Sequence, residues 1–213
     1  YLAKELGGEA LMFMISEGLR VGLLTDHIAV SEVSNAITTK RIRDKVKTMN
    51  QSLIQDFGIV RPRIALLGIN PHSGDDRPIG SEDDTIMRPA IASLFEEGIL
   101  AFGPYAADGF FGSSTYTQFD GVIAAYHDQG LVAFKTLSFG QGVNYTAGLS
   151  RVRTSPDHGT AYAIAGKGEA DPSSFTQALF AAVDIYRRRT AYQALEANKL
   201  KPNQKKAAKE HNA

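Results

Sequence analysis

Apolar residues occur along this chain partly in short continuous runs and partly at helical spacing, which is typical of an α/β protein. Short apolar runs predict strands at residues 10–15, 19–24, 64–69, 99–102 and 122–126. Ser16-Glu17-Gly18 separates the first two runs and predicts a turn between them. The third run is nearly continuous, as expected for a strand that helices cover on both faces.

Helical spacing predicts the segments that cover this sheet. Thr38 or Thr39 can cap a helix that stops at Gly58, with its apolar positions at Ile42, Val46, Met49, Leu53 and Phe57. Ser81 with Asp84 resembles a capping box for a helix that continues to Glu97.

The last third of the chain has a weaker pattern. Residues 131–154 predict mixed strand and turn, and a glycine-rich stretch then leads into a final helix at residues 173–188. From Asn198 onward, the Lys-, Asn- and Ala-rich sequence predicts a frayed or disordered tail.

Composition limits the classes of function. The chain has 213 residues, 43% of them hydrophobic, with 23 basic and 23 acidic side chains and no cysteine. This charge balance argues against general affinity for nucleic acid or an anionic membrane. The absence of cysteine excludes a disulfide scaffold, and no apolar run approaches the ~20 residues that span a bilayer. We therefore expect a soluble, cytoplasmic protein; because it starts at Tyr1 without a methionine, we also expect it to be part of a longer polypeptide.

Three histidines stand where a strand-like run gives way to a polar turn. They are His27, His72 and His127. Strand ends are where open α/β sheets bind ligands, so these imidazoles could converge on one divalent metal in an open, catalytic style of site. Asp26 and Asp128 are adjacent carboxylates that could fix the ring tautomers. The alternative is that each histidine is a hydrogen-bonded structural residue.

Lys135, Asn144 and Arg153 lie on successive short segments after the third histidine. A phosphate or carboxylate ligand is suited to a flexible point charge beside a planar bidentate donor, which Lys and Arg supply. The residues alone favour the other interpretation, a solvated basic face.

Several longer motifs carry a resemblance to a known family. Residues 157–172 contain a His-Gly-Thr turn and a glycine-rich loop that resemble the cofactor loop of β-decarboxylating dehydrogenases such as isopropylmalate dehydrogenase. Further motifs are Asn-Pro-His-Ser-Gly at 70–74, Tyr-His-Asp-Gln-Gly at 126–130, Gly-Val-Asn at 142–144 and Arg-Thr-Ser-Pro-Asp-His-Gly-Thr at 153–160. With them, the chain to about Arg188 resembles the 4-hydroxythreonine-4-phosphate dehydrogenase family of vitamin B6 biosynthesis.

The resemblance implies a fold and its division into lobes. The fold would be a three-layer α/β/α, isopropylmalate-dehydrogenase-like structure with two lobes and a cleft. Residues 1–125 would be mainly the central metal-binding and dimerisation lobe, 126–197 the C-terminal part of the substrate- and NAD-binding lobe, and 198–213 a flexible tail. Members of the family have a longer N-terminus with a Gly-His-Thr-Glu segment, so the first lobe would be incomplete. We expect this piece to fold and dimerise but to turn over slowly or not at all.

The resemblance also implies site residues and a reaction. Its metal ligands fall on His27, His72 and His127, drawn from both subunits of a homodimer, and its substrate contacts on Lys135, Asn144 and Arg153. The cofactor-binding residues would be His158, Gly159, Thr160 and Asp171, and Asp108 or Asp128 could be the proton acceptor. The reaction would be oxidation and decarboxylation of 4-phosphohydroxy-L-threonine to 3-amino-2-oxopropyl phosphate with zinc, magnesium or cobalt and NAD or NADP.

Three other functions remain open at this point. A related dehydrogenase acting on 4-phospho-D-erythronate or threonate would carry the same metal and anion motifs. A non-catalytic, metal-stabilised interaction domain would bind metal without affinity for NAD. A phosphoryl or acyl transferase would need a nucleotide-phosphate loop or a nucleophile motif, and we find no Walker-type Gly-Lys-Ser/Thr and no Gly-x-Ser-x-Gly.

Overall fold

One sheet of seven strands forms the centre of the computed structural model, which describes residues 5–138, 140–157, 159 and 162–200. The strands are β1 (Leu11–Ile15), β2 (Arg20–Leu23), β3 (Arg63–Leu67), β4 (Leu100–Tyr105), β5 (Gly121–Ala124), β6 (Val143–Ala147) and β7 (Thr154–Pro156). Their spatial order is β4-β3-β5-β2-β1-β6-β7. Strands β4, β3, β5 and β2 are parallel, whereas β1, β6 and β7 each pair antiparallel with the preceding neighbour.

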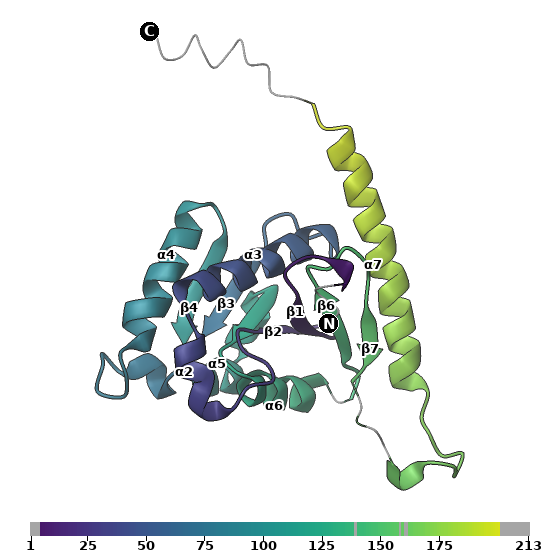
Figure 1. The fold of residues 1–213 in the computed structure, drawn as a ribbon, viewed down its shortest axis with the longest axis horizontal. Helices are drawn as coiled ribbons and strands as arrows, with labels where there is room; N and C mark the ends of the chain where they lie inside the picture. Colours follow the sequence, from purple (N-terminus) through teal and green to yellow (C-terminus); the bar gives the residue numbers. More distant parts are fainter. Residues whose placement is uncertain (1–4, 139, 158, 160–161, 201–213) are drawn as a thin grey trace.

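Helices cover both faces of this sheet (Figure 1). The α-helices are α2 (Val33–Ala36), α3 (Thr39–Gln55), α4 (Arg88–Glu96), α5 (Ala107–Gly112), α6 (His127–Ser138) and α7 (Ser173–Ala197). Shorter helical segments are η1 (Val30–Glu32), η2 (Pro71–Gly74), η3 (Asp83–Met87), η4 (Ser114–Gln118) and η5 (Tyr162–Ile164). Helices α3, α4 and α7 pack on one face, and α5 and α6 on the other. The predicted three-layer α/β/α class is confirmed.

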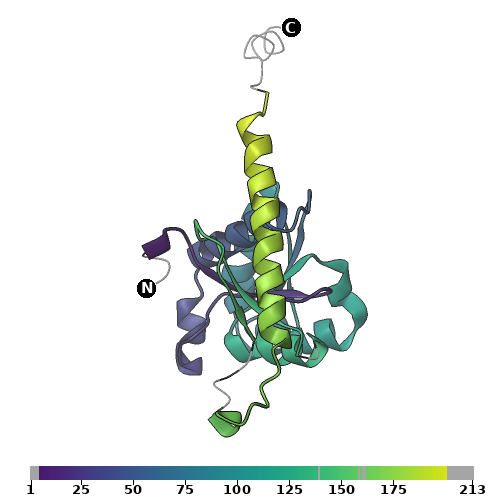
Figure 2. The ribbon, with the colours of Figure 1, turned by 90° about the vertical axis from the view of Figure 1, so that its right-hand side faces the viewer.

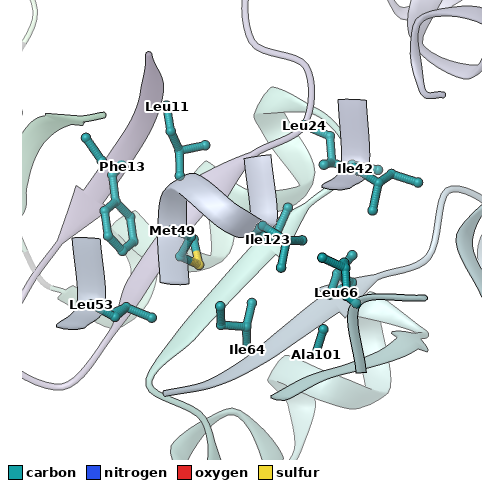
Figure 3. Close-up of a cluster of buried hydrophobic side chains, with 14 of the residues drawn as sticks. Leu11, Phe13, Leu24, Ile42, Met49, Leu53, Ile64, Leu66, Ala101 and Ile123 are labelled. Atoms are coloured by element: carbon teal, nitrogen blue, oxygen red, sulfur yellow. The ribbon is translucent and has the colours of Figure 1, made fainter. Parts of the chain in front are cut away.

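Successive side chains of a strand point to opposite faces of the sheet, which explains why a hydrophobic core lies on each face. In β3, Ile64 and Leu66 face the α3 side while Ala65 and Leu67 face the α6 side, and all of them are buried. Figure 3 shows the α3-side cluster, in which Met49 and Leu53 of α3 lie over Ile64 and Ile123. This strand is therefore covered on both faces, as its continuous apolar run predicted.

Most predicted elements are present at nearly the predicted positions. The turn between β1 and β2 joins an antiparallel pair, and the Thr38 side chain caps α3 by accepting a hydrogen bond from the Arg41 N–H at 3.2 Å. Helix α7 ends at Ala197, beyond the predicted Arg188, and its carboxyl end runs past the sheet (Figures 1 and 2). The division into lobes at residue 125 stays a prediction.

The prediction of mixed strand and turn from residue 131 is wrong at its start, because α6 occupies residues 127–138. Gly130, the last residue of the Tyr-His-Asp-Gln-Gly motif, lies inside this helix, and a Cβ there would come within 2.9 Å of Ala124 and Val21 side-chain atoms. Leu131 and Phe134 are buried against the sheet. The glycine therefore permits close packing of helix on sheet.

The predicted capping box at Ser81 is also wrong. The chain there forms the π-helical segment η3, which has no side-chain cap. Asp84 instead pairs with Arg88 at 2.7 Å. A carboxylate one turn before an arginine on the same helix face is well placed for this contact.

A buried polar network ties α7 to the other layers. The Asp56 carboxylate, fully buried after α3, accepts hydrogen bonds from Arg189 Nε at 2.7 Å, from the Tyr145 hydroxyl at 2.6 Å and from the Ser52 hydroxyl at 2.8 Å. Arg189 also donates to the Leu149 carbonyl at 3.0 Å. Burial and the neighbouring Asp56 charge raise the pKa of Tyr145, so its hydroxyl stays protonated and remains a donor.

We expect Arg189→Ala to lower the free energy of unfolding by about 3 to 5 kcal/mol, because it leaves the Asp56 carboxylate buried without its cationic partner. Arg187→Ala is the matched control, since Arg187 is exposed on the same helix, and it should change stability by less than about 0.5 kcal/mol. Urea unfolding measures both. Equal losses in the two variants would show that the buried pair does not hold α7.

Candidate functional site

Three parallel strands bring the candidate histidines to one edge of the sheet. Strands β3, β5 and β2 are neighbours in that order and run in the same direction, so their carboxyl ends share an edge. His27 follows β2, His72 lies in η2 after β3, and His127 is the first residue of α6 after β5. The local sequences therefore place all three at the edge where ligands bind in open α/β sheets.

His27 and His127 lie close together. Their ring centroids are 5.8 Å apart, at an interplanar angle of 48°. Since a zinc–nitrogen bond is about 2.1 Å, rings at this separation are close enough to approach one ion from two sides. His127 Nδ1 lies 3.6 Å from the Asp128 carboxylate, whereas the Asp26 carboxylate accepts from the backbone N–H of His27 at 2.9 Å and not from its imidazole. Asp128 is 75% exposed, and its distance from Nδ1 is longer than a hydrogen bond.

His72 lines a cavity of about 320 Å³ at the same edge. Its walls include Asp108 from α5 and Tyr126, which directly precedes His127. Within the part of the chain that the structure describes, no three His, Cys, Asp or Glu side chains form a group that could hold a metal. One chain thus brings together two of the three predicted ligands and places Asp108 beside the third.

The loop that carries His72 has a strained backbone. His72, Ser73, Asp75, Asp76 and Arg77 all have positive φ angles, between 45° and 94°. For residues other than glycine this conformation typically costs about 1 to 3 kcal/mol each, and it clusters at functional sites.

Asp83 holds the start of this loop. Its carboxylate has 0% relative exposure and accepts from the Ile69 N–H at 2.8 Å, the Asn70 N–H at 3.1 Å and the Asn70 side-chain amide at 2.9 Å. Glu82 accepts from the same amide at 3.0 Å. Hydrogen bonds led by that from the Ser34 hydroxyl hold the pKa of Glu82 below its ordinary value, so Glu82 stays ionised as it accepts from the Asn70 amide.

The structure brings two of the three predicted anion-binding residues together. Arg153, just before β7, donates to Asn144 Oδ1 at 3.3 Å and to Thr146 Oγ1 at 3.2 Å, both on the neighbouring strand β6. Lys135, in the last turn of α6, pairs with the Asp157 carboxylate at 3.0 Å and is 52% exposed. Arg153 and Asn144 therefore form one polar unit, and Lys135 belongs to an adjacent ion pair.

The predicted cofactor residues are only partly described. His158 and Thr160 lie outside the described residues, and a Cβ added to Gly159 would meet no described atom within 4 Å. The Asp171 carboxylate accepts from the Ser173 hydroxyl at 2.6 Å and from the Ser173 N–H at 2.9 Å, and these bonds lower its pKa. Asp171 thus supports the start of α7, a role that the sequence did not indicate.

Three further residues organise the site and were missed from the sequence. They are Asp83, Thr25 and Gln129. Thr25 and Gln129 bond to the backbone at the strand ends, Thr25 Oγ1 to the Ala125 carbonyl at 2.8 Å and Gln129 Nε2 to the Gly68 carbonyl at 2.8 Å. Gln129 lies in the Tyr-His-Asp-Gln-Gly motif, which could have indicated its role. Asp83 directly precedes Asp84, the residue of the predicted capping box.

Known proteins match this chain over most of its length. The family model for pyridoxal phosphate biosynthetic protein PdxA matches residues 1–182. A relative from Bacteroides thetaiotaomicron, named 4-hydroxythreonine-4-phosphate dehydrogenase, is 50% identical over 203 residues, covering 94% of this chain and 56% of the relative. One from Sulfurihydrogenibium sp. with the same name is 44% identical over 190 residues, covering 89% and 58%. The chain thus spans little more than half the length of these relatives.

Solved structures agree with the fold. A 4-hydroxythreonine-4-phosphate dehydrogenase from Klebsiella pneumoniae has a TM-score of 0.77 and 35% identity, covering 86% of this chain and 56% of that one. A terephthalate 1,2-cis-dihydrodiol dehydrogenase from Burkholderia xenovorans has a TM-score of 0.70 and 27% identity, covering 86% and 59%. The same architecture thus occurs in dehydrogenases named for different substrates.

We expect Asp83→Ala to lower the free energy of unfolding by about 3 kcal/mol, because it removes the buried acceptor of several donors at the start of the His72 loop. Asp84→Ala is the matched control. Asp84 makes partly exposed ion pairs with Arg88 and Arg77, so its loss should cost less than about 1 kcal/mol. Urea unfolding compares the two, and a larger loss for Asp84→Ala would contradict the assignment.

Proposed function

This chain belongs to the pyridoxal phosphate biosynthetic protein PdxA family, and on that premise we propose that it acts in the oxidation of 4-phosphohydroxy-L-threonine. The reaction is NAD(P)-dependent and metal-dependent, and with decarboxylation it yields 3-amino-2-oxopropyl phosphate, a precursor of pyridoxal 5′-phosphate. The observation that carries the proposal is the pair His27 and His127, with ring centroids 5.8 Å apart at the carboxyl edge of the sheet. The 50% identity to a relative named for this substrate supports the choice of reaction.

A divalent ion, zinc, magnesium or cobalt, would be held by His27, His127 and a third ligand. His72 is the candidate for that ligand, contributed by the second copy in a homodimer, since one chain groups only two of the three rings. Such an ion lowers the pKa of a bound hydroxyl and stabilises the negative charge that develops during oxidation and decarboxylation. The chain's own part would be to keep Asp128 close to His127 Nδ1, now 3.6 Å away, and to hold the His72 loop through Asp83.

The polar unit on β6 and β7 supplies the charge for an acidic substrate. The Arg153 guanidinium presents a fixed fork to a phosphate or carboxylate, and Asn144, 3.3 Å from it, holds that fork in place. Lys135 adds a point charge at the end of α6. These residues would bind the two ends of the substrate and fix its hydroxyl near the histidines, which is the positioning part of catalysis.

Asp108 is the better candidate for the proton acceptor. It lines the cavity of about 320 Å³ together with His72 and Asp128 does not, although both aspartates are exposed. A carboxylate in a cavity wall can reach a bound hydroxyl directly, which is the first requirement for a general base.

The nicotinamide cofactor would bind beside the glycine-rich loop that contains Gly159, with Asp171 at its far end. In this chain Asp171 is exposed at the start of α7.

Among the described residues, no helix is both long and apolar enough to cross a membrane. A cytoplasmic location and a homodimer are parts of the proposal.

A related phosphorylated sugar acid is the second candidate substrate. The Burkholderia xenovorans dehydrogenase with the same architecture is named for a dihydrodiol, so the fold itself does not select the substrate. Substrate selection would then depend on the residues that bind the phosphate and carboxylate ends of the substrate, which are Arg153, Asn144 and Lys135.

We expect His127→Ala to weaken Co²⁺ binding by more than about 100-fold, because loss of a partner that merely supports a ligand already costs about 10- to 100-fold. Lys135→Met is the control, since it changes a charge on the same helix without removing a ligand. Isothermal titration calorimetry measures both. Unchanged Co²⁺ affinity in His127→Ala would refute the metal site.

The substrate assignment is tested through Arg153. With Co²⁺ present, Arg153→Met should bind 4-phosphohydroxy-L-threonine about 10- to 100-fold more weakly, since a hydrogen bond to a charged group contributes about 1.5 to 3 kcal/mol. Arg151→Met, at an exposed position two residues away, should bind it as the unchanged chain does. The affinity of the unchanged chain for this substrate and for 4-phospho-D-erythronate, measured in the same way, decides between the two substrates. Metal binding without NAD affinity would instead indicate a non-catalytic domain.

A further inference from the structure

The side chain of Gln129 replaces backbone hydrogen bonds between two neighbouring strands. The parallel pair β3 and β5 keeps a regular register from Ile64 opposite Gly121 to Leu66 opposite Ile123. Beyond that point, Gln129 Nε2 donates to the Gly68 carbonyl at 2.8 Å and Gln129 Oε1 accepts from the Ala125 N–H at 2.7 Å. The carboxamide thus pairs with both strand continuations as a peptide group would.

The same chain of hydrogen bonds continues to the third strand. The Ala125 carbonyl accepts from Thr25 Oγ1 at 2.8 Å and from the Thr25 N–H at 3.2 Å. Gly68, Gln129, Ala125 and Thr25 therefore form one connected row across the carboxyl ends of β3, β5 and β2. His27 and His127 each follow a member of this row by two residues, and His72 follows Gly68 by four.

We propose that Gln129 is a positioning residue that sets the separation between the His72 and His127 segments. The inference rests on the metal role in the proposed function and deepens it. A carboxamide carries a donor and an acceptor side by side. Glutamate offers no donor for the Gly68 carbonyl, and asparagine is one methylene shorter. Gln129 stands in the first turn of α6, where its side chain can reach back to the strand ends that precede the helix.

The amide sets a geometry that the histidines depend on. An error of 1 Å in the placement of a functional group can lower the rate by about 100-fold. Removal of a residue that supports a metal ligand typically lowers metal affinity by about 10- to 100-fold. A leucine at position 129 would fill a similar volume but would leave the Ala125 N–H and the Gly68 carbonyl without this partner.

The test compares Gln129→Leu with Ser52→Ala in the full chain. Ser52 is buried and donates to Asp56 at 2.8 Å on the α3 face of the sheet, so Ser52→Ala is a destabilised variant that leaves the strand ends intact. We expect Gln129→Leu to weaken Co²⁺ binding in calorimetry by about 10-fold or more, and Ser52→Ala to leave it unchanged. Gln129→Glu keeps an acceptor for Ala125 and should lie between Gln129→Leu and the unchanged chain; it also provides the comparison where Gln129→Leu does not fold.

Amide hydrogen exchange gives a second readout that needs no metal. Peptides covering residues 66–72 and 124–127 should exchange faster in the Gln129 variants and at the unchanged rate in Ser52→Ala. Unaltered Co²⁺ affinity in the Gln129 variants, or unaltered exchange in both peptides, would overturn the positioning role. Should the unchanged chain itself fail to bind Co²⁺, the proposed metal function fails, and exchange alone decides whether Gln129 holds the two segments.

Discussion

The buried ion pair between Asp56 and Arg189 is the interaction on which the third layer of this protein depends. Asp56 follows α3, Arg189 lies in α7, and Tyr145, which bonds to both, lies in β6. Removing either charge would leave the other in a region that excludes water, so the three elements are held as one unit. Strand β6 carries Asn144, and β7 beside it is preceded by Arg153. The network thus fixes, from the far side of the sheet, the strand that supports the polar unit.

The carboxyl edge of the sheet combines this rigid support with a strained loop. The sheet continues regularly up to Leu66 and Ile123 and is then held by side chains, Gln129 and Thr25 across the strand ends and Asp83 under the His72 loop. At the strand ends side-chain groups thus take over from regular backbone pairing, and the donors of Gln129, Ala125 and Thr25 in this row have acceptors.

The sequence was informative where one physical effect acts alone. The continuous apolar run of β3 and the helical spacing from Ile42 to Leu53 report burial directly, so those elements were predicted well. Helix α6 was missed because Gly130 is ambiguous: a glycine marks a turn, and it also permits the close helix–sheet contact that is found here. Asp83, Thr25 and Gln129 could not be assigned because their partners lie 14, 100 and 61 residues away. Only the fold brings such groups together.

The proposed metal site also depends on residues that are distant in sequence, and its third ligand would come from a second copy of the chain. The spacing of the histidines relative to their strands predicts a common edge, and the fold places them there, but one copy of the chain brings only His27 and His127 within 5.8 Å. His72 faces a cavity with Asp108 instead. If the third ligand comes from a second copy, the energy of metal binding also stabilises the dimer, since a ligand that binds only the assembled form shifts the equilibrium toward it. Metal and assembly would then be coupled by the same strained loop, because the conformation that Asp83 holds in one copy would have to present His72 to the other.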